Sequence, residues 1–245
     1  MHRDVRIVQP AVYVTPVDTE GWLKTIERAG RLCYRSGHRM TADSCQGFVK
    51  GLVLRGHESV LEHVSWSVVF MCDRAIANQI VRHRIGAYSQ VSSRFDLTAE
   101  RLGGEIAVVE PFYLQPGTPA YATWYEACSA TEVLYRELLA YGCTPEQART
   151  ALPLSLCTYL MVTYNLRQWR HFLRLRTARA AHPQMRQLAI PLYLYLKEHV
   201  PVLFTGIGYD SSFPAEHYAR IIELDEETWG ELIGVPQNPL SGEEV

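Results

Sequence analysis

The sequence predicts an α+β fold, and three observations support this prediction. Strand-like patterns occur over residues 5–16, 63–72 and 155–164, and helical patterns fill most of the remaining chain. The two kinds of pattern do not alternate regularly, as they would in a parallel α/β sheet. The chain has 245 residues, of which 47% are hydrophobic and 20% charged, so it is long and apolar enough for one large core or two small ones.

The first elements follow from periodicity and from capping residues. Residues 5–16 alternate as a strand does, with an interruption at Pro10. Residues 18–36 form a predicted helix with Asp18 or Thr19 as its cap, and a second predicted helix over 44–56 ends at Gly56. Residues 63–72 alternate like a half-buried strand.

The middle of the chain is predicted to be mainly helical. Asp73 opens a helix over residues 73–84, and residues 118–142 form a long helix with apolar positions at mixed spacings of three and four. Pro145 suits the first turn of a short helix that ends near Ala151. The apolar segment 155–164 is predicted to be a buried strand.

Two further helices complete the expected domain. Asn165 opens a helix over 165–176, with Gln168 three residues later at capping-box spacing. Residues 183–200 form an amphipathic helix that Pro191 should kink. We expect residues 1–204 to form a single domain and residues 205–245 to be a peripheral acidic extension.

Several classes of protein are disfavoured by the sequence. No apolar run reaches the eighteen or so residues of a membrane span, and the N-terminus lacks a signal-peptide core, so we expect a cytoplasmic protein without a membrane partner. The six cysteines form no CxxC pair and no zinc framework, so we expect reduced thiols and no metal site.

Charge is strongly segregated although the formal net charge is only −2. Residues 147–197 contain no acid and eight basic residues, whereas the chain after Arg220 contains acids and no Lys or Arg. Nearly all basic residues are Arg, whose planar fork suits carboxylate and phosphate. A codon preference could explain the Arg bias alone, but the acid-free segment indicates an anionic ligand or an acidic partner surface.

The stretch "VRHRIGAYSQVSSRF" over residues 81–95 is the most informative segment. A helix end followed by a left-handed Gly86 would explain the basic residues at 82–84. It does not explain the hydrogen-bonding side chains from Ser89 to Arg94. Mixed donors around an Arg suit a phosphate or a uracil-like base, so the stretch predicts an anion or nucleotide site.

Two other polar stretches leave alternatives open. In "RGHESVLEH", His57 and His63 are six residues apart, which differs from the helical pair of a zinc protease, and a turn that faces a pocket is favoured over a metal site. Arg170 and Arg174 are most simply a solvated basic face. A nucleic-acid-binding module is the rival interpretation, although the pI is about 6.5 and no known motif is present.

The motifs together resemble the flavin-dependent thymidylate synthases, the ThyX family. Arg82-His83-Arg84 followed by Ser92 resembles the family signature. "GHESVLEH", "PEQARTALP", "TYNLRQWRHFLRLR" and "AHPQMR" resemble its other segments, in the same order and at similar spacing from about Gly30 to Arg186.

The resemblance implies a single α+β domain with a twisted, mostly antiparallel sheet and flanking helices, in an intertwined homotetramer with shared active sites. It implies non-covalent FAD, reduction by NADPH, and conversion of dUMP to dTMP with 5,10-methylenetetrahydrofolate as carbon donor and tetrahydrofolate as product. No Cys nucleophile and no DNA or RNA partner is expected. A relative that uses FAD and dUMP with another one-carbon donor remains the alternative.

The resemblance also assigns residues. Arg176 is the expected catalytic residue, which would polarise the uracil. The expected FAD contacts are Ser59, Arg82, His83, Arg84, Gln90, Asn165, Leu166, Arg167 and His171. The expected dUMP contacts are Gln79, Ile80, Val81, Arg82, Gln90, Val91, Ser92, Ser93, Arg94, Arg149 and Arg176. His57 and His182 are weaker candidates.

This chain departs from the family pattern at several positions. Many members have Glu at the position of Gln90, which keeps hydrogen bonding here but removes a charge. Cys33 replaces a common Ser, His171 an Asn, and Phe95 a Tyr. Two additional residues between Arg176 and His182 weaken the assignment of His182.

Overall fold

The computed structural model describes residues 5–95, 97 and 104–234. Its first half contains β1 (Arg6–Val8), β2 (Ala11–Val14), α1 (Thr19–Cys33), α2 (Ser44–Leu54), β3 (Ser65–Asp73), α3 (Arg74–Ile80), β4 (Ala87–Gln90) and β5 (Ala107–Val109). Its second half contains α4 (Pro119–Ala140), α5 (Pro145–Ala148), β6 (Cys157–Asn165), α6 (Leu166–Arg176), α7 (Pro183–His199), α8 (Pro201–Phe204), β7 (Arg220–Glu223) and α9 (Glu226–Ile233).

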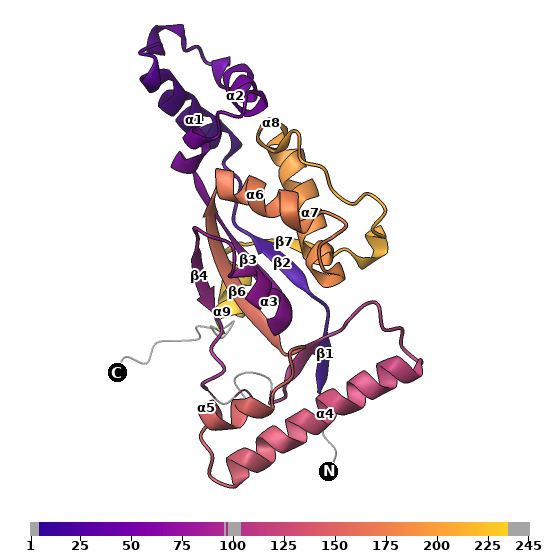
Figure 1. The fold of residues 1–245 in the computed structure, drawn as a ribbon. Coiled ribbons are helices and arrows are strands. Elements are labelled where there is room, and N and C mark those ends of the chain that lie inside the picture. The colour runs from indigo at the N-terminus through magenta and orange to yellow at the C-terminus, as the bar shows by residue number, and fades with distance from the viewer. Residues whose placement is uncertain (1–4, 96, 98–103, 235–245) are drawn as a thin grey trace, which may run out of the picture.

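A five-stranded sheet with the order β4-β6-β3-β2-β7 forms the centre of the molecule. β2, β3, β6 and β4 pair antiparallel, and β7 joins β2 in parallel. α1 and α2 lie at one end of the elongated molecule, and α4 and α5 lie at the other (Figure 1). The predicted α+β class with a mostly antiparallel sheet and flanking helices is confirmed.

The predicted interruption of the first strand is also confirmed. Pro10 separates β1 from β2, and the two strands enter different sheets. β1 pairs with β5 in a two-stranded parallel sheet, whereas β2 lies inside the five-stranded sheet. Because Pro has no backbone N–H, it suits the break between the two ladders.

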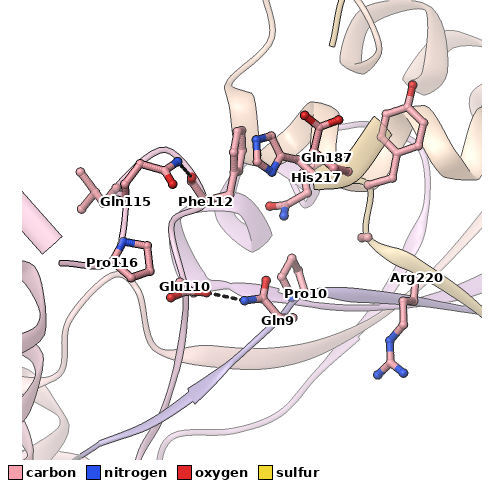
Figure 2. Close-up of a pocket in the computed structure, with 13 residues that line it drawn as sticks. Gln9, Pro10, Glu110, Phe112, Gln115, Pro116, Gln187, His217 and Arg220 are labelled. Atoms are coloured by element: carbon pink, nitrogen blue, oxygen red, sulfur yellow. Dashed lines mark hydrogen bonds between the residues drawn. The ribbon is translucent and has the colours of Figure 1, made fainter. Parts of the chain in front are cut away.

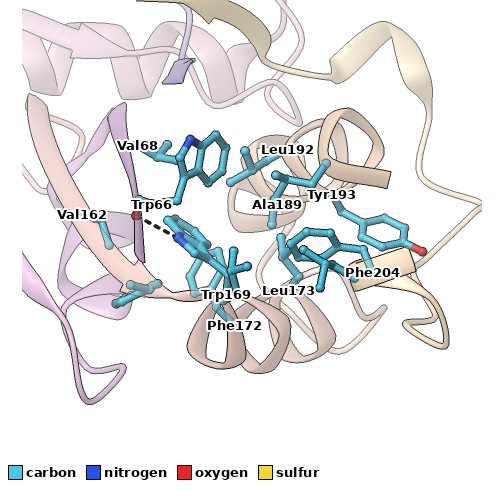
Figure 3. Close-up of a cluster of buried hydrophobic side chains, with 14 of the residues drawn as sticks. Trp66, Val68, Val162, Trp169, Phe172, Leu173, Ala189, Leu192, Tyr193 and Phe204 are labelled. Carbon is cyan, nitrogen blue, oxygen red and sulfur yellow. Dashed lines mark hydrogen bonds between the residues drawn. The ribbon is translucent and has the colours of Figure 1, made fainter. Parts of the chain in front are cut away.

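The main core lies between the five-stranded sheet and helices α6 and α7 (Figure 3). Side chains of β6 alternate between buried and half-buried, so only one face of this strand enters the core. The prediction of a buried strand is therefore correct for one face of β6. Trp66 and Trp169 are central to the core, and the Trp169 indole donates a hydrogen bond to the Trp66 carbonyl at 3.0 Å.

A second, smaller core lies beneath α4. Val5, Ile106, Val108, Cys128 and Tyr135 are buried there, from β1, β5 and α4 together with their flanking residues. α4 therefore packs on the two-stranded sheet at the end of the molecule opposite α1 and α2 (Figure 1).

The helix predicted over 73–84 is shorter than expected. α3 ends at Ile80, and residues 82–84 lie in the turn that follows. Gly86 does not take a left-handed conformation. A Cβ there would stand 2.3 Å from the Tyr164 ring, so this glycine permits close packing and does not cap a helix.

The predicted boundary at residue 204 cuts through the folded unit. β7 extends the main sheet, and Ile207, Phe213 and Leu224 are buried. The interpretation of 205–245 as peripheral is therefore wrong for residues 205–224, because their side chains complete the sheet and the core beneath it. α9 follows this segment, and residues 235–245 of the predicted extension lie outside the described residues.

α7 runs from Pro183 to His199 with Pro191 inside it. Within the described residues, no helix has the length and apolar character required to cross a membrane.

Candidate functional site

Three side chains, from the end of α3, the turn after it and the end of α6, meet at one place. Arg176 Nε donates to His83 Nε2 at 2.7 Å, and Arg176 Nη1 donates to the side-chain oxygen Oε1 of Gln79 at 3.5 Å. Gln79 lies in the last turn of α3, and Arg176 is the last residue of α6. The early end of α3 places His83 in a turn, from which its ring reaches Arg176.

Burial and charge determine the protonation state of His83. The ring is buried, and desolvation together with the Arg176 and His171 charges lowers the pKa of His83 to about 4. His83 is therefore neutral near pH 7, and its Nε2 lone pair accepts the Arg176 hydrogen bond. Burial also lowers the pKa of Arg176, which is partly enclosed.

A pocket of about 480 Å³ adjoins this cluster and contains several of the expected flavin contacts. Arg84, Asn165, Arg167 and His171 line it, together with Glu58, Glu62, Gln168 and Arg174. The His171 ring lies 6.0 Å from the His83 ring, which links the pocket to the first cluster. The pocket therefore joins residues from the 58–62 turn, the 84–85 turn and α6.

The polar groups of this pocket fit an oxygen-rich ligand such as a flavin dinucleotide. Gln168 Nε2 is buried without a hydrogen-bond partner, so a donor in the wall is available. Arg84 and Arg174 add cationic donors, and Asn165 adds an amide. Orphaned donors in pocket walls are costly unless a ligand satisfies them.

Two acids balance part of the positive charge. Arg167 pairs with Glu62 at 2.6 Å, and both side chains are about half exposed. Arg170 pairs with Glu58 at 3.0 Å and donates to the Leu203 carbonyl. Arg170 is only 4% exposed, so its interpretation as a solvated basic residue is wrong, and it anchors α6 to the end of α8.

A separate group of arginines surrounds the loop after β4. Arg94 and Arg149 both approach Glu146, at 3.2 Å and 3.8 Å. Arg74 donates to the Val91 carbonyl at 3.1 Å, and its Nε is buried without a partner. Arg74 opens α3 and Gln79 lies five residues later, so the backbone positions of these two residues are about 8 Å apart along the helix axis.

The other expected dUMP contacts lie along the same loop and the end of α3. Gln90 donates to Thr158 Oγ1 at 3.3 Å, and Ser92 Oγ accepts the Arg94 backbone N–H at 3.2 Å. Ser93 is buried. The Ile80 carbonyl accepts from the Tyr164 hydroxyl, and the Val81 carbonyl accepts from Arg84.

The remaining flavin candidates have different surroundings. Ser59 begins the short 3₁₀ helix over residues 59–63, next to the pocket residue Glu58. Arg82 is exposed in the turn after α3. The Leu166 side chain is fully buried in the main core, so only its backbone is available to a ligand.

The two weaker candidates lie outside the flavin pocket. His57 lines a different pocket, between α1 and α2. His182 caps α7 by accepting the Gln184 N–H at 3.3 Å, and its ring lies 6.3 Å from Tyr113.

A further pocket, of about 400 Å³, contains none of the predicted site residues. Figure 2 shows Phe112 beside His217 on one side and Gln9 hydrogen-bonded to Glu110 on the other. This pocket lies where the loop after β5 meets the segment before β7. No sequence motif indicated that these two segments would be neighbours.

Sequence reasoning missed Arg74, Glu58, Glu62 and Arg174 as members of these groups. The two glutamates belong to the "GHESVLEH" stretch, which was predicted to be a turn that faces a pocket. No sequence pattern indicated that they would form ion pairs with arginines of α6. Arg74 follows the helix cap Asp73, where a charged residue is usually solvated.

All six cysteines lie in the described residues and are free. Burial raises the pKa of Cys72 and Cys128, and it raises the pKa of Cys157 to about 12. These three side chains are thus thiols and not thiolates near pH 7. Among the described residues, no group of His, Cys, Asp or Glu forms a metal-binding cluster.

Comparison with known sequences gives one consistent family. The model of the family "Thymidylate synthase complementing protein" matches residues 17–202. The flavin-dependent thymidylate synthase of Pyrococcus furiosus is 31% identical over 71% of this chain and 71% of its own length. The enzymes of the same name from Geobacter sulfurreducens (32% identical, 74% of this chain and 79% of the relative) and Mycobacterium tuberculosis (31% identical, 76% and 80%) agree.

A solved structure supports the fold. The UMP/dUMP methylase PolB from Streptomyces cacaoi, bound with 5-Br dUMP, superposes with a TM-score of 0.67 over 82% of this chain and 95% of that chain. The two sequences are 20% identical, so this likeness concerns the fold.

Proposed function

The chain belongs to the flavin-dependent thymidylate synthase family, and from this premise we propose that it methylates dUMP to dTMP in the cytoplasm. The carbon donor is 5,10-methylenetetrahydrofolate, the hydride comes from FAD reduced by NADPH, and tetrahydrofolate is released. No cysteine attacks the uracil, in keeping with the raised pKa values of the Cys72, Cys128 and Cys157 thiols.

The observation that carries this proposal is the placement of Arg176. Its guanidinium is held at two points, by neutral His83 and by Gln79, and is partly enclosed. A uracil activated at C5 gains negative charge at N3 and O2, and a fixed cation stabilises that charge most in the activated state. Because His83 is neutral, it orients Arg176 without reducing the positive charge that faces the base.

The pocket of Arg84, Asn165, Arg167, Gln168 and His171 would hold the flavin. FAD supplies hydride chemistry that no protein side chain offers. The role of these residues is to bind and orient. Arg84 and Arg167 offer charge-assisted hydrogen bonds to phosphate oxygens, and Gln168 Nε2 offers a free donor.

The arginines around the loop after β4 would hold the nucleotide phosphate. Arg94 and Arg149 converge on the Glu146 carboxylate, whose oxygens occupy the kind of position that a phosphate would take. The unpartnered Nε of Arg74 adds a donor beside Val91. A phosphate there and a uracil near Arg176 would lie at opposite ends of α3.

We also propose that the active enzyme is a homotetramer with shared sites. The flavin pocket and the arginines around the loop after β4 are separate surfaces of one chain. Assembly would let a second copy of the chain complete each of these sites. Light scattering of the purified protein should give four times the chain mass of 27.9 kDa. A monodisperse monomer with full activity would contradict this part of the proposal.

The function is tested by an absorbance spectrum of the purified protein, with and without dUMP. We expect flavin absorbance that NADPH bleaches, and faster bleaching when dUMP is present. Protein that stays colourless and cannot be loaded with FAD would overturn the proposal.

Product analysis resolves the carbon donor and the base. With labelled 5,10-methylenetetrahydrofolate and dUMP, the label should appear in dTMP. Because the structural neighbour PolB is named a UMP/dUMP methylase, UMP should be run in parallel. Label in methylated UMP alone would contradict thymidylate synthesis, and no label from this donor would indicate another carbon source.

A further inference from the structure

The pocket between α1 and α2 lies outside every group of residues described so far. Its volume is about 480 Å³, and it is lined by Arg31, Tyr34, Ser36, His38, Arg39, Phe48, Leu52, Arg55 and His57. These residues come from the end of α1, the turn that follows it, and the face and end of α2, at the end of the molecule farthest from α4 (Figure 1).

The lining is positively charged and contains no acid. Three arginines and two histidines face the space. Arg31 is neutralised by Glu27, which accepts from its Nη2 at 3.0 Å, and its guanidinium lies 4.2 Å from the Phe48 ring centre. The ion pairs found among the described residues include neither Arg39 nor Arg55. An anion would therefore meet two available guanidinium groups.

The backbone around the pocket is held in an uncommon conformation. Arg35, in the turn between two lining residues, has φ of +47°. Non-glycine residues in the left-handed region cost free energy and cluster at binding sites. Tyr34 beside it is 75% exposed, an unusual state for a large aromatic side chain unless a ligand or a partner covers it.

Consecutive residues link this pocket to the proposed flavin pocket. His57 lines this pocket and the next residue, Glu58, lines the other. The chain turns at Gly56, directly before these two residues, with a φ of +73° that favours glycine. A long ligand could therefore place its reacting end at the flavin and its anionic end between α1 and α2.

We propose that this pocket binds the terminal anionic group of a co-substrate, a phosphate or a short run of carboxylates. The inference rests on the proposed function, because both co-substrates of that reaction end in such a group: the ribose phosphate of NADPH and the glutamate tail of the folate. Arg39 and Arg55 contact the anion, and the Tyr34 and Phe48 rings flank the uncharged part of the ligand.

Equilibrium binding tests this inference without requiring turnover. Calorimetry of the FAD-loaded protein would compare NADP⁺ with NAD⁺, and pentaglutamyl with monoglutamyl tetrahydrofolate. We expect wild type to prefer the more anionic member of one pair. The Arg39→Gln/Arg55→Gln variant should lose about tenfold or more of that preference, because each charge-assisted hydrogen bond is worth about a decade in affinity.

Two variants provide the controls. Arg28→Gln removes an exposed charge from α1 that does not line the pocket, and it should keep the wild-type preference. Arg39→Lys/Arg55→Lys keeps the charge and should keep most of the preference, which separates lost recognition from misfolding.

The pair that responds identifies the source of the anion. The inference is overturned if wild type shows no preference in either pair, or if Arg28→Gln lowers the preference as much as the pocket variant does. Failure to form dTMP would overturn the proposed function, whereas the binding results could still be interpreted because they do not require turnover.

Discussion

Arg176 and His83 form a donor and acceptor pair in which the His83 ring stays neutral and the Arg176 guanidinium carries the charge. Burial is the main cause that disfavours protonation of His83, and the Arg176 cation at 2.7 Å adds to this effect. The neutral ring can in turn accept the hydrogen bond that orients the guanidinium. The sequence motif contains both residue types, but their 93-residue separation gave no reason to pair them.

At the residue scale, we expect Arg176→Lys to reduce turnover by at least about 10²-fold, as loss of an aligned donor to a developing anion does. Lys supplies a point charge and cannot contact His83 and Gln79 with a planar fork. Single-turnover rates of flavin oxidation with dUMP check this, and a flavin spectrum should show unchanged FAD content. Arg179→Lys, at an exposed position near the same helix end, is the matched control. Unchanged turnover in Arg176→Lys would refute its role.

A second residue-scale prediction concerns pH. The folded-state pKa of His83 is lowered from 6.5 to about 4, so below pH 6.5 the unfolded chain takes up a proton that the folded chain does not. Stability from neutral His83 is thus complete above pH 6.5 and falls until about pH 4. The loss across this window is about 3 kcal/mol, at 1.36 kcal/mol per pKa unit.

Urea unfolding of wild type and His83→Gln at several pH values measures this contribution. Gln cannot titrate, so the stability difference between the two proteins should shift in favour of the variant as the pH falls from 7 to 4. A difference that does not depend on pH would show that His83 is not held neutral.

At the scale of elements, the turn between α3 and β4 depends on close packing against β6. A Cβ on Gly86 would lie 2.3 Å from the Tyr164 ring, which is buried and hydrogen-bonded to the Ile80 carbonyl. The turn carries His83 and Arg84, so its position decides whether these side chains reach α6. Predicting the helix too far, to residue 84, concealed this dependence.

We therefore expect Gly86→Ala to destabilise the protein by about 1–3 kcal/mol, the usual cost of overpacking. Gly47→Ala is the control, because no atom lies within 4 Å of a Cβ at this exposed position in α2. Alanine there should be neutral or stabilising by about 0.5–1 kcal/mol. Thermal unfolding of both variants gives the comparison, and equal effects would contradict the close-packing argument.

Capping residues were the local features most accurately predicted from the sequence. Asp18, Asp73 and Asn165 each accept a backbone N–H at the start of their helix. The capping box expected at Asn165 is only half formed, because the Asn165 side chain accepts the Gln168 N–H but the Gln168 side chain does not accept the Asn165 N–H in return. Caps are read correctly because their hydrogen bonds span three residues and need no tertiary contact.

At the scale of the whole molecule, the segment after α8 closes the sheet and the core. Ile207, Phe213 and Leu224 are buried, and Arg186 forms an ion pair with Asp210. The acidic composition of this segment suggested a peripheral position, because its many charged residues outnumber the few apolar residues that are buried.

Truncation tests this correction. A chain that stops after Phe204 should lose about 5 kcal/mol or more, since each large buried side chain contributes about 1.5–3 kcal/mol. Such a loss removes most of the stability of an ordinary domain, so we expect an insoluble or unfolded product. A chain that stops after Gly234 should melt close to the full-length protein. Equal melting of the two truncated chains would restore the peripheral interpretation.

The sequence by itself determined the α+β class, most elements, the helix caps and the family motifs, because these depend on periodicity and on contacts within a few residues. Only the tertiary structure decided that Arg176 meets His83, that Arg170 is buried and paired with Glu58, and that β7 joins β2. Those contacts join segments far apart in the chain. Their geometry follows from how the core packs, which local patterns do not encode.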